Sequence, residues 1–198
     1  MRKLFKWLSY IFKAKEMNDE INKPIKKVAI IVGHGNGDSG AIGWNRFAEF
    51  DYNVMVAEEI ADSDLGKEVK VFYRGSSGIA GVAMKAVAYN PDLSIELHLN
   101  AFNGKATGCE VLCLDGDEQS AIVGRSFANA FTQKFNRKLR REKGINWITG
   151  ADRGHSSLKA VSPIRHSILV EPFFIDTKEE WIEPMTYCNF LKEWIKEL

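Results

Sequence analysis

Two kinds of apolar segment alternate along this chain, and their alternation restricts the fold more than any other feature. Short apolar runs such as "KVAIIVG" (27–33) and "CEVLCL" (109–114) are typical of buried β-strands. Between such runs, apolar residues recur at helical spacing, as Phe47, Phe50 and Val54 do. Strands that alternate with helices predict an α/β fold, in which helices flank a largely parallel sheet.

The same patterns predict the order of the elements and the extent of the domain. A polar segment that ends at Pro24 is typical of a linker. We therefore expect an N-terminal segment, 1–24, and one domain, 25–198, built as a three-layer, twisted, phosphorylase/hydrolase-like sheet with helices on its faces. The expected strands are 27–33, 69–73, 93–101, 109–114 and 167–174. The expected helices are 47–61, 78–90 and 118–135, and the segment 178–198 is expected to be mostly helical after Pro184.

Charge and cysteine content narrow the class of protein. Lys and Arg (27) nearly balance Asp and Glu (26), so bulk positive charge cannot drive nucleic-acid binding, and we expect no nucleic-acid partner. Three cysteines cannot all pair within one chain. Cys109 and Cys113 lie in one expected strand, where four residues span about 13 Å, too far for a disulfide. We expect reduced, packed thiols.

Residues 1–17 have the pattern of a basic amphipathic helix. No apolar run reaches the roughly 20 residues of a membrane span. Lys6 interrupts the apolar part and no small-residue cleavage site follows, so we expect no signal peptide. The helix could lie on a membrane surface, pack on its own domain or form a partly ordered tail. Its apolar face comprises Leu4, Trp7, Leu8 and Ile11.

Chemically active side chains stand where the carboxyl ends of the expected strands meet. One strand leads into His34, another carries His98 near its end, and a third carries Glu171. Glu49 stands near the start of the helix that follows the His34 loop. Sites in α/β sheets collect at this edge. Two histidines and a carboxylate match a hydrolytic zinc site with an open position, and a further carboxylate can serve as general base.

Each of these residues also has a structural interpretation. A histidine at a strand end can simply pack or form hydrogen bonds, and Glu49 can be a favourable acid at a helix N-terminus. Asp38 and Asp51 are competing candidates for the carboxylate ligand. Glu171 is harder to explain structurally, because "ILVEPFF" places a charge within an apolar strand, where an unpaired carboxylate is costly.

Four motifs in one order resemble those of the zinc-dependent N-acetylmuramoyl-L-alanine amidases of the amidase 3 type. A strand runs into Gly-His-Gly and a loop rich in Asp, Gly and Ala, in "IIVGHGNGDSGAIG". A helix carries a glutamate with an asparagine four residues later, in "EFDYNVMVA", and a strand ends in His-x-Asn-Ala, in "NPDLSIELHLNA". An apolar run leads into Glu-x-Phe-Phe, in "ILVEPFFI". Four motifs in order are specific, and the resemblance covers about 26–198.

The resemblance implies an enzyme that uses one Zn²⁺ ion to hydrolyse the amide between N-acetylmuramic acid and L-alanine in peptidoglycan. It makes His34, Glu49 and His98 the metal ligands, choosing Glu49 over Asp51, and Glu171 the catalytic residue. A phage endolysin, or another enzyme of wall lysis or remodelling, is then the expected context. Such an enzyme would be made in the cytoplasm and act on the wall, and we expect a monomer. Alternatives are zinc carboxypeptidase-like cleavage within the stem peptide and a non-catalytic wall-binding module.

Several further residues each have alternative roles. Asn53 and Asn100 fall in the family motifs as candidates for contacts with substrate or with the metal ligands. Glu96 replaces the family's usual small residue and points to the same face of its strand as His98, so it either orients His98 or is a surface charge. Arg153 and His155 lie in an expected loop and either line a substrate groove or are solvated. The basic run "RKLRREKG", 137–144, either touches an anionic wall polymer or is a solvated helix end.

Overall fold

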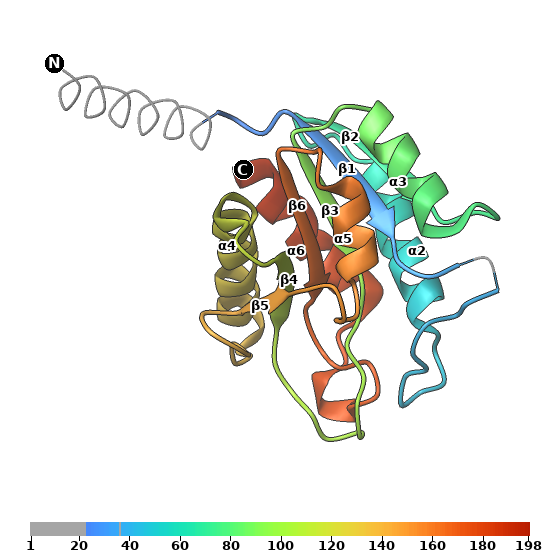
Figure 1. Cartoon of the computed structure of the whole chain (residues 1–198). Coiled ribbons are helices and arrows are strands. Elements are labelled where there is room, and N and C mark those ends of the chain that lie inside the picture. Colours follow the sequence, from blue (N-terminus) through green and yellow to red (C-terminus); the bar gives the residue numbers. More distant parts are fainter. Residues whose placement is uncertain (1–22, 36) are drawn as a thin grey trace, which may run out of the picture.

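The computed structural model describes residues 23–35 and 37–198, which form a six-stranded sheet with helices on both faces (Figure 1). The helix expected over 1–17 lies outside the described residues. Within the described ranges, no helix is both long enough and apolar enough to cross a membrane. Cys109, Cys113 and Cys188 are buried and free, as expected.

The sheet has the strand order β2-β1-β3-β6-β4-β5. Neighbouring strands are parallel except β4 and β6, which are antiparallel, so β4 and β5 run opposite to the other four. The α/β architecture with a largely parallel sheet is therefore confirmed. The strands are β1 (Lys27–Val32), β2 (Glu68–Tyr73), β3 (Leu93–Leu97), β4 (Glu110–Leu114), β5 (Ile145–Ile148) and β6 (His166–Glu171).

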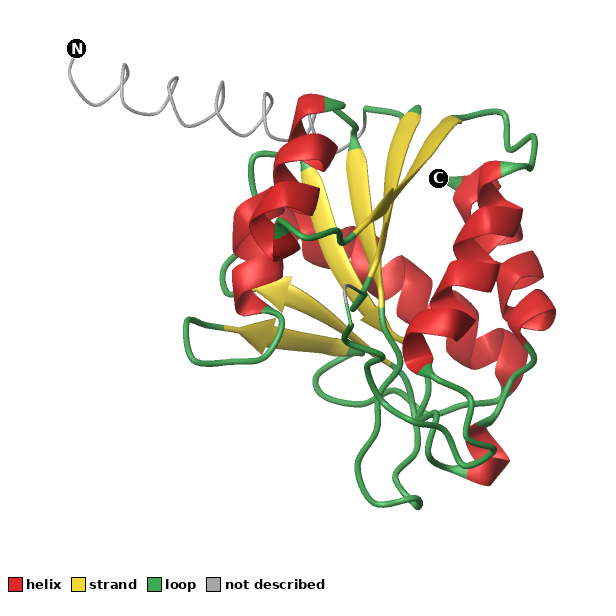
Figure 2. Ribbon diagram, turned by 90° about the vertical axis from the view of Figure 1, so that its right-hand side faces the viewer, coloured by secondary structure: helices red, strands yellow, loops and turns green. Residues whose placement is uncertain are grey.

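Helices cover the two faces of the sheet and enclose two separate cores (Figure 2). Both α2 and α4 pack on α6 over one face, whereas α3 packs on α5 over the other. Strand β1 serves both cores, because Ile30 faces one and Ile31 the other, as the strand period of two requires. The helices are α2 (Glu49–Ala61), α3 (Gly78–Ala88), α4 (Glu118–Phe135), α5 (His155–Val161), the short 3-10 helix η1 (Lys178–Glu180) and α6 (Pro184–Glu197).

Three features of the fold differ from the sequence-based expectation. Strand β5 and helix α5 were not predicted, because segments of four and seven residues are too short to show a clear period. The expected strand 93–101 ends at Leu97, and the expected strand 167–174 ends at Glu171. The reversed direction of β4 was also not predicted, since residue patterns within a strand do not encode its direction.

Phe127 of α4 anchors the larger core. Its side chain is fully buried, and its ring centroid lies 5.2 Å from that of Trp194 and 5.6 Å from that of Phe190, both on α6. A third ring, that of Phe131, lies 6.0 Å away in a stacked arrangement. Phe127 is therefore one of the side chains that join α4 to α6, together with Phe131, whose ring centroid lies 5.4 Å from that of Phe190.

The substitution Phe127→Ala is expected to lower the free energy of unfolding by about 3–5 kcal/mol, because it removes a buried ring and leaves a cavity. Urea unfolding at equilibrium would measure the loss. Ile122→Ala is the matched control on the same helix, since Ile122 is 45% exposed, and its effect should stay within about 0.5 kcal/mol. Equal losses in the two variants would contradict this account of the core.

Candidate metal centre and active-site groove

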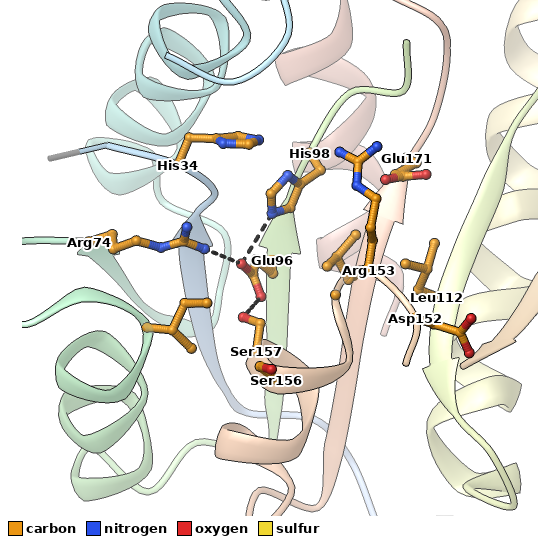
Figure 3. Close-up of a pocket in the computed structure, with 13 residues that line it drawn as sticks. His34, Arg74, Glu96, His98, Leu112, Asp152, Arg153, Ser156, Ser157 and Glu171 are labelled. Carbon is orange, nitrogen blue, oxygen red and sulfur yellow. Dashed lines mark hydrogen bonds and ion pairs between the residues drawn. The ribbon is translucent and has the colours of Figure 1, made fainter. Parts of the chain in front are cut away.

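Three adjacent parallel strands deliver the predicted site residues to one edge of the sheet (Figure 3). His34 lies two residues beyond β1, His98 follows β3 directly, and Glu171 is the last residue of β6. Because β1, β3 and β6 are neighbours with a common direction, their carboxyl ends meet. Residues that are far apart in the chain thus lie around one groove.

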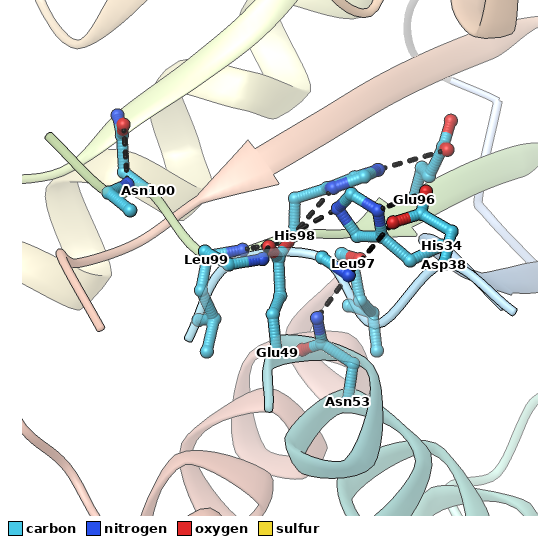
Figure 4. Close-up of polar contacts among 12 residues, drawn as sticks. His34, Asp38, Glu49, Asn53, Glu96, Leu97, His98, Leu99 and Asn100 are labelled. Atoms are coloured by element: carbon cyan, nitrogen blue, oxygen red, sulfur yellow. Dashed lines mark hydrogen bonds and ion pairs between the residues drawn. The ribbon is translucent and has the colours of Figure 1, made fainter. Parts of the chain in front are cut away.

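The side chains of His34, Glu49 and His98 converge as a candidate metal centre (Figure 4). One ligand atom from each lies within 4.8 Å of the others. The Glu49 carboxylate lies between the two imidazoles. Its Oε2 is 3.2 Å from His34 Nε2, and its Oε1 is 3.0 Å from His98 Nδ1. Two imidazoles and one carboxylate from separate elements form a donor set that suits Zn²⁺ and leaves further coordination positions open.

Glu49 is held as a carboxylate although it is only 2% exposed. Its oxygens accept hydrogen bonds from the backbone N–H groups of Ala41 (2.9 Å) and Leu99 (2.8 Å). Burial would raise the pKa of Glu49, but hydrogen bonds and charge interactions with His34 and His98 outweigh burial and hold it well below its usual value. A group that stays ionised is suited to binding a cation.

Each histidine has a second carboxylate on its other ring nitrogen. Asp38 Oδ2 lies 2.8 Å from His34 Nδ1, and Glu96 Oε1 lies 3.1 Å from His98 Nε2. Since a carboxylate only accepts, the ring nitrogen donates in each contact. While each outer nitrogen keeps its proton, the nitrogen that faces Glu49 can give up its own, and its lone pair would then be open to a metal ion. Asp38 therefore orients His34, and the geometry does not favour it as the third ligand.

Glu96 is buried beneath His98, so the interpretation as a surface charge is wrong. Besides His98, its carboxylate accepts hydrogen bonds from Arg74 Nη2 at 3.2 Å and from the Ser157 hydroxyl. Burial would raise the pKa of Glu96, but contacts with His98, Ser157 and Arg74 lower it below its usual value. For His98, burial would lower the pKa, but hydrogen bonds with Glu49 and Glu96 raise it to about 10.

Two glycines leave room for the metal-site side chains. A Cβ on Gly33 would collide with the ring of His98. A Cβ on Gly40 would lie 2.6 Å from His34 Cδ2 and 2.7 Å from Glu49 Oε2. Gly40 also has a φ of +68°, a left-handed conformation that favours glycine. The glycine-rich loop after β1 is thus required by the packing of the cluster itself.

Glu171 differs from the other carboxylates of the site, because among the described residues none donates a hydrogen bond to its side chain. Burial is the main cause that raises its pKa to about 7, and the negative charges of Glu110 and Glu49 add to the rise. The positive charges of His98 and Arg153 act in the opposite direction. A carboxyl group with this pKa can both accept and release a proton near neutral pH.

Two adjoining cavities make up the groove, and Glu171 borders both. The first, about 290 Å³, is lined by His34, His98 and Glu96. The second, about 330 Å³, lies on the β4 and β5 side of Glu171. Arg153 lines both cavities, so the loop before α5 faces the groove. The groove therefore runs past the metal centre and across Glu171.

The remaining predicted residues have different places. Asn53 is buried below the groove, where its Nδ2 donates to the carbonyl of Leu97 at 3.2 Å and steadies the chain just before His98. Asn100 lines the second cavity and donates to Glu110 Oε1 at 2.7 Å. His155 begins α5 and is not among the residues that line the two cavities.

Sequence reasoning missed two residues of the groove. Arg74 directly follows β2, the strand-end position that identified His98. Glu110 is a charge in an apolar strand, the signal that singled out Glu171, and the two residues are opposite each other in the antiparallel pair β4 and β6. Both signals were present, but only the direction of β4 brings Glu110 to this edge.

The substitution Gly40→Ala is expected to weaken zinc binding by roughly tenfold or more, because the added methyl group displaces His34 and Glu49. Gly37→Ala is the matched control, since Gly37 also has a positive φ (+87°) but has no atom within 4 Å of an added Cβ. Competition with a chromogenic chelator would compare the two affinities. If both variants bound zinc equally well, packing of Gly40 against the cluster would not matter.

The chain is similar to several solved structures. Cwp6 from Clostridium difficile shares 25% identity at a TM-score of 0.67, with 87% of this chain and 28% of that chain covered. The catalytic domain of the CD27L endolysin, which targets Clostridia difficile, shares 24% identity at a TM-score of 0.65, with 88% and 98% covered. The catalytic domain of CwlV, an N-acetylmuramoyl-L-alanine amidase from Bacillus (Paenibacillus) polymyxa var. colistinus, shares 20% identity at a TM-score of 0.62, with 86% and 94% covered.

These likenesses extend over nearly the whole CD27L and CwlV domains, whereas this chain spans less than a third of the Cwp6 chain. No curated protein sequence matches the chain. The profile of the N-acetylmuramoyl-L-alanine amidase family matches residues 28–183, most of the chain, and the protein therefore belongs to this family.

Proposed function

We propose that this chain is a zinc-dependent amidase that hydrolyses the bond between the lactyl group of N-acetylmuramic acid and L-alanine in peptidoglycan. The convergence of His34, Glu49 and His98 beside a carboxyl group of raised pKa, Glu171, is the observation that carries the proposal. Membership of the amidase family supports the choice of substrate.

Zinc would be held by His34, Glu49 and His98, and when bound it would polarise the scissile carbonyl and activate a water molecule. Asp38 and Glu96 hold the two imidazole rings in place through their outer nitrogens. Their carboxylates also raise the basicity of the ligands, which strengthens metal binding. The chain thus contributes a site whose ligands are oriented before substrate arrives.

Glu171 moves the proton in this mechanism. As a carboxylate, it accepts a proton from the water molecule that attacks the lactyl carbonyl carbon. It then donates this proton to the amide nitrogen as the C–N bond breaks. One water molecule is consumed, and the products are a lactyl carboxyl group on the glycan and a free amino group on L-alanine. A pKa of about 7 suits both proton transfers.

The wider biological role is also a proposal. The similar CD27L domain belongs to an endolysin, and this likeness supports a role in wall lysis for the present chain. Synthesis in the cytoplasm and action on the wall are consistent with that role. Membrane contact through residues 1–17 and a monomeric state stay predictions from the sequence.

Product analysis tests the proposed reaction directly. Purified peptidoglycan would be digested with the zinc-loaded protein, beside a control treated with a chelator, and the released fragments analysed by mass spectrometry. Metal-dependent release of intact stem peptides with a new L-alanine amino group is the expected result. Cleavage within the stem peptide would support carboxypeptidase-like activity instead, and binding without release would support a wall-binding module.

The substitution Glu171→Gln is expected to keep the zinc content and lower kcat by roughly 10²–10⁴-fold, because the amide cannot carry the proton. Zinc would be measured by elemental analysis and turnover by release of the L-alanine amine. Glu197→Gln, at the end of α6, is the control for loss of one carboxylate. Near-normal turnover in Glu171→Gln would remove Glu171 from its proposed role.

Glu96 is proposed as a positioning residue for His98, so Glu96→Gln is expected to weaken zinc binding about 10–100-fold. The amide keeps the size of the side chain but loses the charge that faces His98 Nε2 and Arg74. Chelator competition would give the zinc affinity, and thermal unfolding would show whether the variant is folded. A folded variant with unchanged zinc affinity would contradict this role.

A further inference from the structure

Two residues of the basic run 137–144, Arg140 and Arg141, line the groove on the far side of Glu171 from the metal centre. The backbone of this run lies along the start of β4, where Cys109 N donates to the carbonyl of Lys138 at 3.0 Å. Arg140 N donates in return to the carbonyl of Cys109 at 2.9 Å. Because β4 runs antiparallel to β6, the start of β4 lies beside the end of β6. Arg140 and Arg141 are thereby brought to the second cavity, which both residues line.

Glu110 holds the two arginines in a fixed arrangement. Its carboxylate is buried, with Oε1 2.9 Å from Arg140 Nε and Oε2 3.2 Å from Arg141 Nε. Arg140 also stacks over the ring of Phe174, with Cζ 4.8 Å from the ring centroid. Since Glu110 uses the Nε atoms, the terminal amino groups of the guanidinium of Arg141 form no hydrogen bond with any described residue.

The backbone at Arg141 is held in an uncommon conformation. Its φ is +53°, in the left-handed region that non-glycine residues seldom occupy. Lys143 and Gly144 in the same turn also have positive φ values, +53° and +82°. Such a conformation persists only where surrounding contacts hold it, and here the turn presents a half-exposed arginine to the cavity.

The second cavity has donors for an anion that the protein itself does not satisfy. Three guanidinium groups line it, those of Arg140, Arg141 and Arg153. Three carboxylates, those of Glu110, Asp152 and Glu171, line the same cavity. Glu110 accepts hydrogen bonds from Asn100 and the two arginines, and Oδ2 of Asp152 accepts two from Thr149. Among the described residues, none of the three arginines is hydrogen-bonded to Asp152 or Glu171. A planar guanidinium with free terminal amino groups is suited to a bidentate contact with a carboxylate.

The direction of the substrate follows from the proposed function, on which this inference rests. The candidate metal ligands His34 and His98 line the first cavity, whereas Glu171 lines both. The nitrogen that Glu171 protonates belongs to the leaving L-alanine, so the rest of the stem peptide continues past Glu171. A stem peptide that continues on the β4 side of Glu171 would enter the second cavity, and the glycan would then lie on the side of the first.

The spacing of neighbouring strands gives the distance between Glu171 and the arginines that Glu110 holds. Glu110 and Glu171 are opposite each other on neighbouring strands, where Cα atoms are about 5 Å apart. An extended peptide advances about 3.3–3.6 Å per residue. A carboxylate carried by the residue after L-alanine would therefore come within range of the guanidinium groups that Glu110 holds.

We propose that Arg141, supported by Arg140 and Arg153, forms a subsite for a free carboxylate on the stem peptide, at the residue after L-alanine. The subsite makes the enzyme select stems in which this carboxyl group is free over stems in which it is amidated. Arg141 is the specificity-determining residue, because its terminal amino groups are available and its side chain is half-exposed to the cavity.

Paired muramyl peptides test the subsite. The two substrates are identical except that the carboxyl group of the residue after L-alanine is free in one and amidated in the other. The kcat/KM value of the free-carboxylate substrate, divided by that of the amidated substrate, is expected to fall about tenfold in Arg141→Gln. The fall should come mainly from a higher KM for the free-carboxylate substrate. Lys143→Gln is the matched control, since it removes one charge from the same turn outside the cavity lining, and its ratio should equal that of the unsubstituted protein. An unchanged ratio in Arg141→Gln would overturn the proposal.

A binding measurement separates this subsite from the proposed activity. Isothermal titration of the zinc-loaded full chain with the two stem peptides alone, free and amidated, requires no turnover. Tighter binding of the free-carboxylate peptide that is lost in Arg141→Gln and kept in Lys143→Gln would support the subsite even if no amide were cleaved. Equal binding of both peptides by the unsubstituted protein would overturn the subsite, whatever the outcome of the product analysis.

Discussion

The buried carboxylate of Glu49 is the group on which the arrangement of the site depends. It receives backbone N–H groups from Ala41 and Leu99 and contacts the imidazoles of His34 and His98. An ion buried without partners costs several kcal/mol, so these contacts must form together for the charge to be tolerated. They come from the loop after β1 and from the end of β3, while Glu49 itself begins α2. One carboxylate thus joins three separate parts of the chain.

The other carboxyl groups at this edge show how the fold assigns different roles to one functional group. Glu96 accepts hydrogen bonds from His98, Arg74 and Ser157. Glu110 accepts hydrogen bonds from two arginines and Asn100. Glu171 has no such partners among the residues that the structure describes, and burial is the main cause that raises its pKa. The chemical difference between a structural carboxylate and a proton carrier arises here from the number of donors supplied by neighbouring strands.

The expectation that site residues collect at the carboxyl ends of parallel strands placed His34, His98 and Glu171 at one edge of the sheet, and they lie there in the structure. Hydrophobic patterns mark roughly where strands end, and neighbouring parallel strands bring their carboxyl ends together. The same patterns do not specify strand direction, so the position of Glu110 opposite Glu171 could not be predicted. The burial of Glu96 could not be predicted either, since either face of a strand can be covered or exposed. Glu96 is covered in part by the short helix α5, which carries Ser157. Strand β5 and helix α5 were too short for periodicity to detect.

The reversal of β4 and β5 gives the two halves of the groove separate origins in the chain. The half that contains the metal centre is built from the carboxyl ends of parallel strands and from α2. These elements pack in the hydrophobic core. The half that contains the arginines is built from the start of β4, from β5, from the turn that joins α4 to β5 and from the loop after β5 that carries Arg153. That turn can change in length or charge without disturbing the buried ligands. Substrate preference and bond cleavage can therefore diverge independently among proteins that share this scaffold.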